Sequence, residues 1–174
     1  HPEVRARMRG VAVHEASNMD VIICGGGDIG GSAAEVLAAA GDAVTIIESD
    51  DHRASDLADN LDVAIVHGSG STADTLRAAG VAHADAVIAT TATDEVNLVI
   101  SAVAHALGAA STMARVDHSG LLRDASLDYA GIFGGGRLFS PDRALARSMA
   151  ARIRHPEASA IEHFGGGIEM QQFE

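Results

Sequence analysis

The chain has 174 residues, of which 47% are hydrophobic, and its formal net charge is −12. This length suits one domain with a small appendage and is enough to bury a core. All 12 basic residues are arginine, and because nucleic-acid phosphates require clustered positive charge, we expect no nucleic-acid partner. An acidic, lysine-free composition is typical of proteins adapted to high salt, in which screening weakens the repulsion between carboxylates.

The single cysteine, Cys24, lies inside an apolar run. One cysteine excludes a disulfide framework, and we expect a buried structural thiol in a reducing, cytoplasmic setting. No apolar run reaches the about 18 residues of a transmembrane helix, and no signal peptide precedes the first predicted strand. We therefore expect a protein that is not itself inserted in a membrane.

Strand-like and helix-like segments alternate along most of the chain. Residues 1–18 precede the first apolar run and are interpreted as an N-terminal tail or an upstream linker. Apolar runs then recur near 20–24, 43–47, 62–66, 86–90 and 112–116, and a helical pattern follows each of them. Apolar strands separated by helices are typical of a parallel sheet that is covered on both faces. The sequence therefore predicts an α/β fold, a Rossmann-like doubly wound parallel sheet over residues 19–139.

Several residues mark the expected helix ends. Glycine after a helix favours its termination, and threonine or serine favours its start. The expected C-terminal glycines are Gly41 and Gly80, and the expected N-caps are Thr72, Thr93 and Ser140.

The segment 140–174 follows the predicted sheet. Pro141 fits the first position of a helix that carries an apolar stripe at a spacing of four, formed by Leu145, Met149 and Ile153. Because little core remains for this stripe to cover, it predicts a symmetric partner chain. The alternative is that the stripe folds back onto its own domain or onto the hairpin. Two strand-like runs flank three glycines within 158–174, which predicts a β-hairpin that opens a following C-terminal module.

The chemistry is concentrated where the first strand breaks into glycines. Gly25-x-Gly27-x-x-Gly30 lets the chain turn, lets the backbone approach a phosphate and lets the helix pack close to the strand. The helix N-terminus adds unpaired N–H groups and a positive dipole end. Glu48, at the end of the second apolar run, fits the acidic residue that accepts hydrogen bonds from a ribose. Together these residues predict a nucleotide-binding site.

Three further segments come directly after predicted strands. They are residues 67–71, residues 90–97 and Arg115. Ligands of open α/β sheets bind at the carboxyl ends of the strands, so we expect these segments to join the glycine loop. The hydroxyl and glycine residues at 67–71 suit an adenine or ribose edge, and the threonine-rich turn suits the phosphates or a second nucleoside.

These motifs in this order and spacing resemble the TrkA N-terminal family, the RCK or KTN domains that regulate potassium transporters and channels. The residues that carry the resemblance are Gly25-x-Gly27-x-x-Gly30, Glu48, Arg53, His67-Gly68-Ser69, Thr91-x-x-Asp94-Glu95-x-Asn97 and Ala114-Arg115. The resemblance covers about residues 19–155 and implies a cytoplasmic regulatory subunit of a Trk-type potassium uptake system or channel. Such a subunit binds NAD(H) or ATP/ADP, forms homodimers or higher rings, and gates a membrane-embedded potassium transporter or channel subunit from the inner face of the cell membrane.

The resemblance also implies a set of nucleotide contacts. They are Gly25, Gly26, Gly27, Asp28, Ile29, Gly30, Glu48, Arg53, Ser69, Thr91, Ala92 and Arg115. Ser69 replaces the acidic or imidazole side chain of many members, and Ala92 replaces a hydrogen-bonding residue, so a second nucleoside is expected to be held less tightly. The helix from Pro141 to Ile153 resembles the crossover helix through which members of the family dimerise.

Two other functions compete with this interpretation. The same glycine loop serves dehydrogenases, so a small NAD-dependent oxidoreductase is the alternative. Such an enzyme needs a substrate pocket and a proton donor aimed at the nicotinamide, and we expect neither from the helix and hairpin at 140–174. A purely structural module with no ligand would have no use for both Glu48 and Arg115. The histidines at positions 67, 83, 105 and 118 show no metal-ligand spacing and are expected on turns or the surface.

Overall fold

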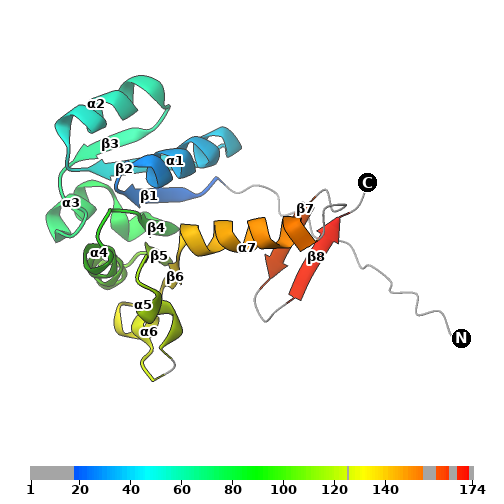
Figure 1. The fold of residues 1–174 in the computed structure, drawn as a ribbon. Coiled ribbons are helices and arrows are strands. Elements are labelled where there is room, and N and C mark those ends of the chain that lie inside the picture. Colours follow the sequence, from blue (N-terminus) through cyan, green and yellow to red (C-terminus); the bar gives the residue numbers. More distant parts are fainter. Residues whose placement is uncertain (1–17, 125, 155–159, 165–167, 173–174) are drawn as a thin grey trace, which may run out of the picture.

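The computed structural model describes residues 18–124, 126–154, 160–164 and 168–172. Its centre is a six-stranded sheet with the strand order β3-β2-β1-β4-β5-β6, and every pair of neighbouring strands is parallel (Figure 1). Helices follow the strands along the chain. The predicted α/β, Rossmann-like doubly wound architecture is therefore confirmed.

The elements follow one another in the predicted alternation. Their bounds are β1 (Asp20–Cys24), α1 (Asp28–Ala40), β2 (Ala43–Glu48), α2 (Asp51–Asn60), β3 (Ala64–His67), α3 (Ala73–Ala78), the short 3₁₀ helix η1 (Val81–His83), β4 (Ala86–Ala89), α4 (Asp94–Ala106), β5 (Thr112–Arg115), α5 (Ser119–Arg123), α6 (Tyr129–Ile132), β6 (Arg137–Phe139), α7 (Pro141–Arg154), β7 (Ala160–Phe164) and β8 (Ile168–Gln172). The five predicted strands are all present, with the third shifted toward its C-terminal end.

The sixth strand, β6, was not predicted from the sequence. It has only 3 residues, and it pairs with β5 through Arg137 opposite Met113 and Phe139 opposite Arg115. A segment this short shows no periodicity of its own. Its extended conformation depends on backbone hydrogen bonds to β5, which the local sequence does not reveal.

The two faces of the sheet bury different side chains. Ile23 and Ile46 belong to the cluster beneath α1 and α2, whereas Ile22 and Ile47 belong to the cluster beneath α3 and α4. The chain thus leaves β1 toward one face and β4 toward the other, although these strands are neighbours. This reversal separates the loops that follow β1 and β4, and it is the place where open α/β sheets bind ligands.

The helix ends lie at the residues predicted from the sequence, but the expected side-chain capping bonds are only partly present. Gly41 has φ +97° and ends α1, and Gly80, with φ +84°, follows α3. Thr72 and Thr93 are the N-caps of α3 and α4, but neither side chain makes a capping hydrogen bond. The Thr72 hydroxyl instead donates to the Ser69 carbonyl oxygen at 3.0 Å. Ser140 precedes α7 and accepts a long hydrogen bond, 3.5 Å, from the Arg143 N–H.

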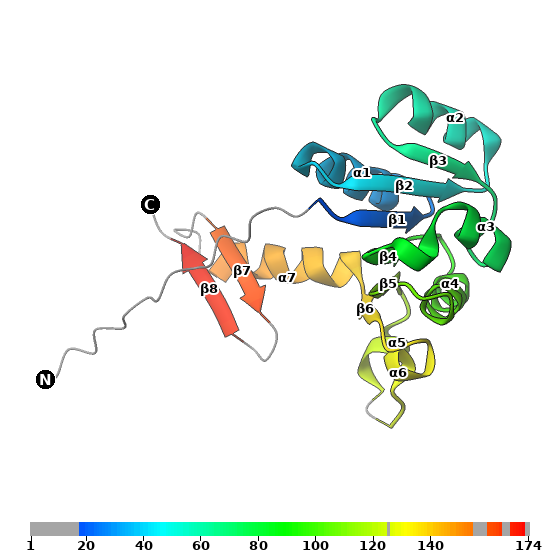
Figure 2. The ribbon, with the colours of Figure 1, turned by 180° about the vertical axis from the view of Figure 1, so that it is seen from behind.

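Helix α7 leads from β6 away from the sheet and toward the antiparallel hairpin of β7 and β8 (Figures 1 and 2). The predicted C-terminal helix and hairpin are therefore confirmed. Three apolar residues of α7 are strongly exposed: Leu145 by 61%, Met149 by 57% and Ile153 by 80%. The predicted N-terminal tail lies outside the described residues, apart from residue 18.

Candidate nucleotide-binding site

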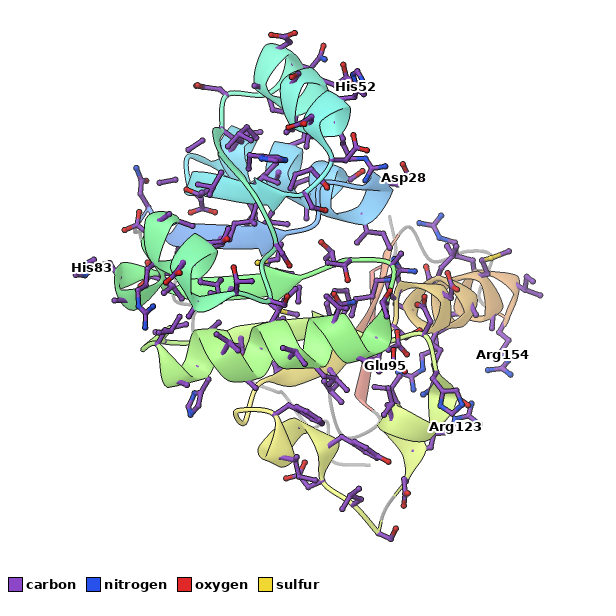
Figure 3. The ribbon with its side chains drawn as sticks, turned by 90° about the vertical axis from the view of Figure 1, so that its left-hand side faces the viewer. Asp28, His52, His83, Glu95, Arg123 and Arg154 are labelled. Atoms are coloured by element: carbon purple, nitrogen blue, oxygen red, sulfur yellow. The ribbon has the colours of Figure 1, made fainter. Side chains whose placement is uncertain are left out.

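The carboxyl edge of the sheet gathers the residues that the motifs singled out. Gly25 follows β1, Glu48 ends β2, Ser69 follows β3, Thr91 follows β4 and Arg115 ends β5. In Figure 3, Asp28, His52 and Glu95, which lie at the starts of α1, α2 and α4, are on one side of the molecule, opposite His83. The parallel topology thus brings segments that are distant in the sequence to one edge.

The glycine loop requires glycine at two positions. Gly25 has φ +102°, and a Cβ atom there would lie 3.0 Å from the Thr91 nitrogen. A Cβ atom on Gly30 would collide with the Gly25 carbonyl oxygen and lie 2.7 Å from the Thr90 hydroxyl. The first glycine therefore makes the turn, and the third allows α1 to begin close to the strands.

The N-terminus of α1 is open. Gly27 is its N-cap, no side chain caps the helix, and a Cβ atom on Gly27 would meet nothing within 4 Å. Asp28 begins the helix and is exposed, and Ile29 follows it half-buried. The first amide groups of a helix lack partners within it, so this end is suited to an anion.

The Glu48 side chain is buried in the site and accepts several backbone hydrogen bonds. It is only 4% exposed. Its Oε2 atom accepts a hydrogen bond from the Gly26 N–H at 2.8 Å, and its Oε1 atom accepts from the N–H groups of Ser49 and Asp50 at 2.7 and 2.9 Å. The carboxylate therefore ties the glycine loop to the end of β2, a role that the sequence did not indicate.

The same contacts fix the charge of Glu48. Burial favours the neutral acid, but backbone N–H donors from Asp50, Gly26 and Ser49, together with the Arg53 guanidinium, outweigh it and lower the pKa of Glu48. Arg53 Nη1 lies 3.6 Å from Oε2, and the arginine side chain is 53% exposed. Arg53 thus lies beside the glycine loop, as the motifs predict, and its guanidinium is paired with the Glu48 carboxylate.

The loop after β3 begins next to Glu48, because His67 at the end of β3 pairs with Glu48 of β2. His67 is exposed, and its Nε2 atom lies 3.1 Å from the Ser49 carbonyl oxygen and 3.0 Å from a carboxylate oxygen of Asp51. Both partners are acceptors, so this nitrogen carries the hydrogen. Ser69 is exposed, with its hydroxyl 2.8 Å from that of Ser71. The expectation of surface histidines is confirmed, because His67, His83, His105 and His118 are all exposed.

Asn97 joins the loops that follow β4 and β5. Its side chain is fully buried, and its Oδ1 atom accepts from the N–H and the hydroxyl of Thr91 at 2.8 and 2.7 Å. Its Nδ2 atom donates to the carbonyl oxygens of Thr91 and Arg115, each at 3.0 Å. Asn97 therefore positions two predicted contact residues, whereas Ala92 lies exposed beside them.

Arg115 is held by a carboxylate that sequence reasoning missed. Its Nε and Nη2 atoms donate to the two carboxylate oxygens of Asp117 at 3.2 and 2.6 Å. The Asp117 N–H in turn donates to both carboxylate oxygens of Asp94 at 2.9 and 3.1 Å. The only sequence signal for this pair is the spacing of two residues between opposite charges.

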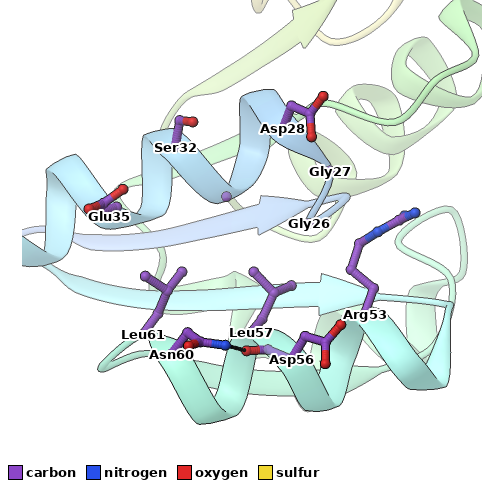
Figure 4. A pocket seen from close by; sticks show the side chains of 11 residues that line it. Gly26, Gly27, Asp28, Ser32, Glu35, Arg53, Asp56, Leu57, Asn60 and Leu61 are labelled. Carbon is purple, nitrogen blue, oxygen red and sulfur yellow. Dashed lines mark hydrogen bonds between the residues drawn. The ribbon is translucent and has the colours of Figure 1, made fainter.

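A cleft of about 430 Å³ opens between α1 and α2 beside the glycine loop (Figure 4). Gly26, Gly27, Asp28 and Arg53 line it, together with residues such as Glu35 and Asp56. Ser69, Thr91, Ala92 and Arg115 are not part of its lining. The cleft thus accounts for only four of the twelve predicted contacts, whereas Thr91, Ala92 and Arg115 belong to the ends of β4 and β5.

Cys24 behaves as the sequence predicts. It is 1% exposed, and burial raises the pKa of its thiol to about 12. In the part of the chain that the structure describes, no helix is long and apolar enough to cross a membrane.

Comparison with known proteins identifies the family. Residues 21–130 match the family described as the TrkA-N domain. The chain belongs to this family. Among curated proteins, this TrkA-N chain is 36% identical over 151 residues to the Trk system potassium uptake protein TrkA of Halomonas elongata. The match covers 86% of the chain but only 33% of that relative, so the chain spans about a third of its length.

Solved structures share the fold of this TrkA-N chain. The TrkA-N domain of the inner membrane protein ybaL from Escherichia coli matches with a TM-score of 0.66 and 22% identity, over 78% of this chain and 97% of that one. The GsuK channel bound to NAD matches with a TM-score of 0.62 and 18% identity, over 86% of this chain and 26% of that one. GsuK bound to ADP matches with a TM-score of 0.65 and 19% identity, over 82% of this chain and 36% of that one.

Proposed function

We propose that this TrkA-N chain binds NAD(H) or ATP/ADP at the carboxyl edge of its sheet, regulates a potassium uptake system or channel, and catalyses no reaction. The curated relative is named as a potassium uptake protein, and the GsuK channel, which shares the fold, is described with NAD and with ADP. These likenesses support the class of ligand and of partner.

The observation that carries the proposal is the open N-terminus of α1, held in place by Glu48. The Gly27 N-cap leaves space for a ligand, and the bond from Gly26 to Glu48 fixes the loop around it. Preorganised N–H groups at a helix end are suited to a pyrophosphate. We further propose that Glu48 accepts a hydrogen bond from the ribose through the lone pair that its backbone donors leave free on Oε2.

The proposed regulation requires partners. The exposed apolar stripe of α7 supports a homodimer, or a higher ring, because an apolar stripe is usually covered by another surface. The proposed target is a membrane-embedded potassium transporter or channel subunit, to which the chain binds at the cytoplasmic face. Ligand-dependent changes in the relative positions of the paired domains would then carry the signal.

Calorimetric titration of the protein with NAD, NADH, ATP and ADP in high salt tests the proposal. We expect saturable binding of at least one of them, and no steady consumption of NADH in the presence of small carbonyl substrates. No heat with any of the four refutes nucleotide binding. Substrate-dependent NADH consumption favours the oxidoreductase instead.

A further inference from the structure

The two arginines of the site are both paired with carboxylates of their own chain. Arg53 lies 3.6 Å from Glu48, and Arg115 is bound by Asp117 through two hydrogen bonds. These pairs differ in exposure, because the Glu48 side chain is 5% exposed and the Asp117 side chain is 42% exposed. Asp117 is therefore the partner that solvent, or another anion, can replace.

Arg115 is close enough to the glycine loop for such a replacement. Cys24, Ala89 and Ala114 are register partners in β1, β4 and β5. The residues that follow these three partners in the chain are Gly25, Thr90 and Arg115. Neighbouring strands are about 4.8 Å apart, so the Cα atom of Arg115 lies on the order of 10 Å from the start of the loop. An arginine side chain crosses most of that gap.

The backbone around Arg115 is fixed independently of its side chain. Asn97 binds the Arg115 carbonyl oxygen, and Asp94 binds the backbone N–H groups of Asp117 and His118. The guanidinium can therefore exchange one anion for another while the ends of β5 and α4 stay in place. The side chain of Asp117 makes no contribution to these backbone bonds.

We propose that the Asp117 carboxylate occupies an edge of the Arg115 guanidinium that a nucleotide phosphate can bind, and that it competes with the nucleotide for this edge. The inference rests on the proposed nucleotide binding. Asp117 accepts from Nε and Nη2 of Arg115, and a phosphate can bind that same planar edge of a guanidinium in a bidentate way, so the two anions compete for this edge. Asp117 thereby lowers the affinity for phosphate-rich ligands and determines how strongly the site selects them.

The test is calorimetric titration of the full chain with ATP, in the wild type and in Asp117→Asn. The asparagine keeps the backbone N–H that Asp94 binds, so the local fold is preserved. An exposed ion pair contributes little, and we expect the variant to bind ATP about fivefold more tightly. Arg115→Gln should bind ATP more weakly than the wild type, because the phosphate loses its cation.

Two controls separate competition from a general change in charge. Asp59→Asn removes one negative charge near the C-terminal end of α2, which lies at the opposite edge of the sheet from Arg115. It should leave ATP affinity close to that of the wild type. In an Arg115→Gln background, Asp117→Asn should no longer tighten binding, because the guanidinium over which the anions compete is gone.

The outcomes are distinct. Tightening by Asp117→Asn that disappears without Arg115 supports the proposal, as does binding by this variant when the wild type binds too weakly to measure. Unchanged or weaker binding by Asp117→Asn overturns it, as does equal tightening in Asp59→Asn or in the Arg115→Gln background. If neither the wild type nor Asp117→Asn binds ATP or NAD(H), nucleotide binding itself is refuted and the inference falls with it.

Discussion

Replacing Gly27 by aspartate separates the stability of α1 from its capacity to bind an anion. Gly27 is the N-cap, with φ −68° and ψ −171°, a conformation that aspartate adopts readily. An added Cβ atom would meet nothing within 4 Å. The new carboxylate can accept hydrogen bonds from the first amide groups of α1, which no side chain caps in the native protein.

The two effects of Gly27→Asp have opposite signs. Aspartate at an N-cap stabilises a helix by a few tenths of a kcal/mol relative to glycine, so the melting temperature should stay the same or rise slightly. For a nucleotide, the carboxylate takes the N–H donors and repels the phosphate. A penalty of about 2–3 kcal/mol for this like-charge contact corresponds to about 30- to 150-fold weaker binding.

Thermal denaturation and calorimetric titration with ATP in high salt measure both effects on the same preparation. Val36→Asp is the matched control, because it adds the same charge farther along α1, at a side chain that is 69% exposed and does not line the cleft. Its side chain is not at the N-cap, so its ATP affinity should change little. Unchanged ATP affinity in folded Gly27→Asp, or an equal loss in Val36→Asp, would refute the role of the α1 N-terminus.

Glu48 should repel a 2′-phosphate at about 1–3 kcal/mol, so NADP(H) should bind more weakly than NAD(H) in competition titrations; equal affinities would contradict the ribose role. Because the pKa of Glu48 is lowered from its ordinary value of 4.5, its contribution to stability is fully present above that pH and is lost as the pH falls through the lower folded-state pKa. Urea denaturation against pH should therefore show a weaker acid limb in Glu48→Gln, and parallel limbs would contradict this. The net charge of −12 predicts that the melting temperature falls on dialysis to low salt, whereas a flat or rising value would count against adaptation to salt. Changing both Leu145 and Met149 to aspartate should convert a dimer into a monomer that still binds nucleotide, as measured by light scattering and titration; a wild type that is already monomeric at moderate concentration would overturn the dimer.

Much of the fold follows from local sequence patterns. The apolar runs of the first five strands and the glycines that end α1 and follow α3 are readable because a strand, a turn or a cap depends on residues that are adjacent in the chain. The glycine loop is readable for the same reason, since Gly25 and Gly30 satisfy steric demands of a single turn. Thr72 and Thr93 show the limit of this approach. Both mark the start of a helix, as predicted from the sequence, but neither side chain makes the capping hydrogen bond that a threonine can make there.

The candidate site was located from the sequence, but its internal contacts were not. Parallel pairing places the ends of β1 to β5 together, so motifs that follow strands can be assigned to one edge. Sequence reasoning gave Glu48 a role toward a ribose alone. The structure adds its bonds to Gly26, Ser49 and Asp50, which depend on how deeply the end of β2 is buried.

The sequence by itself determined the order of elements, the glycine turn and the family to which the motifs point, because these are encoded by residue types at short spacings. Only the tertiary structure decided that β6 is a strand, that Asn97 joins two loops and that Asp94 binds the Asp117 N–H. Each of these depends on the position of one strand or loop relative to another. Hydrogen bonds and ion pairs are satisfied by distance and direction in space, which residues far apart in the chain acquire only when the sheet has formed.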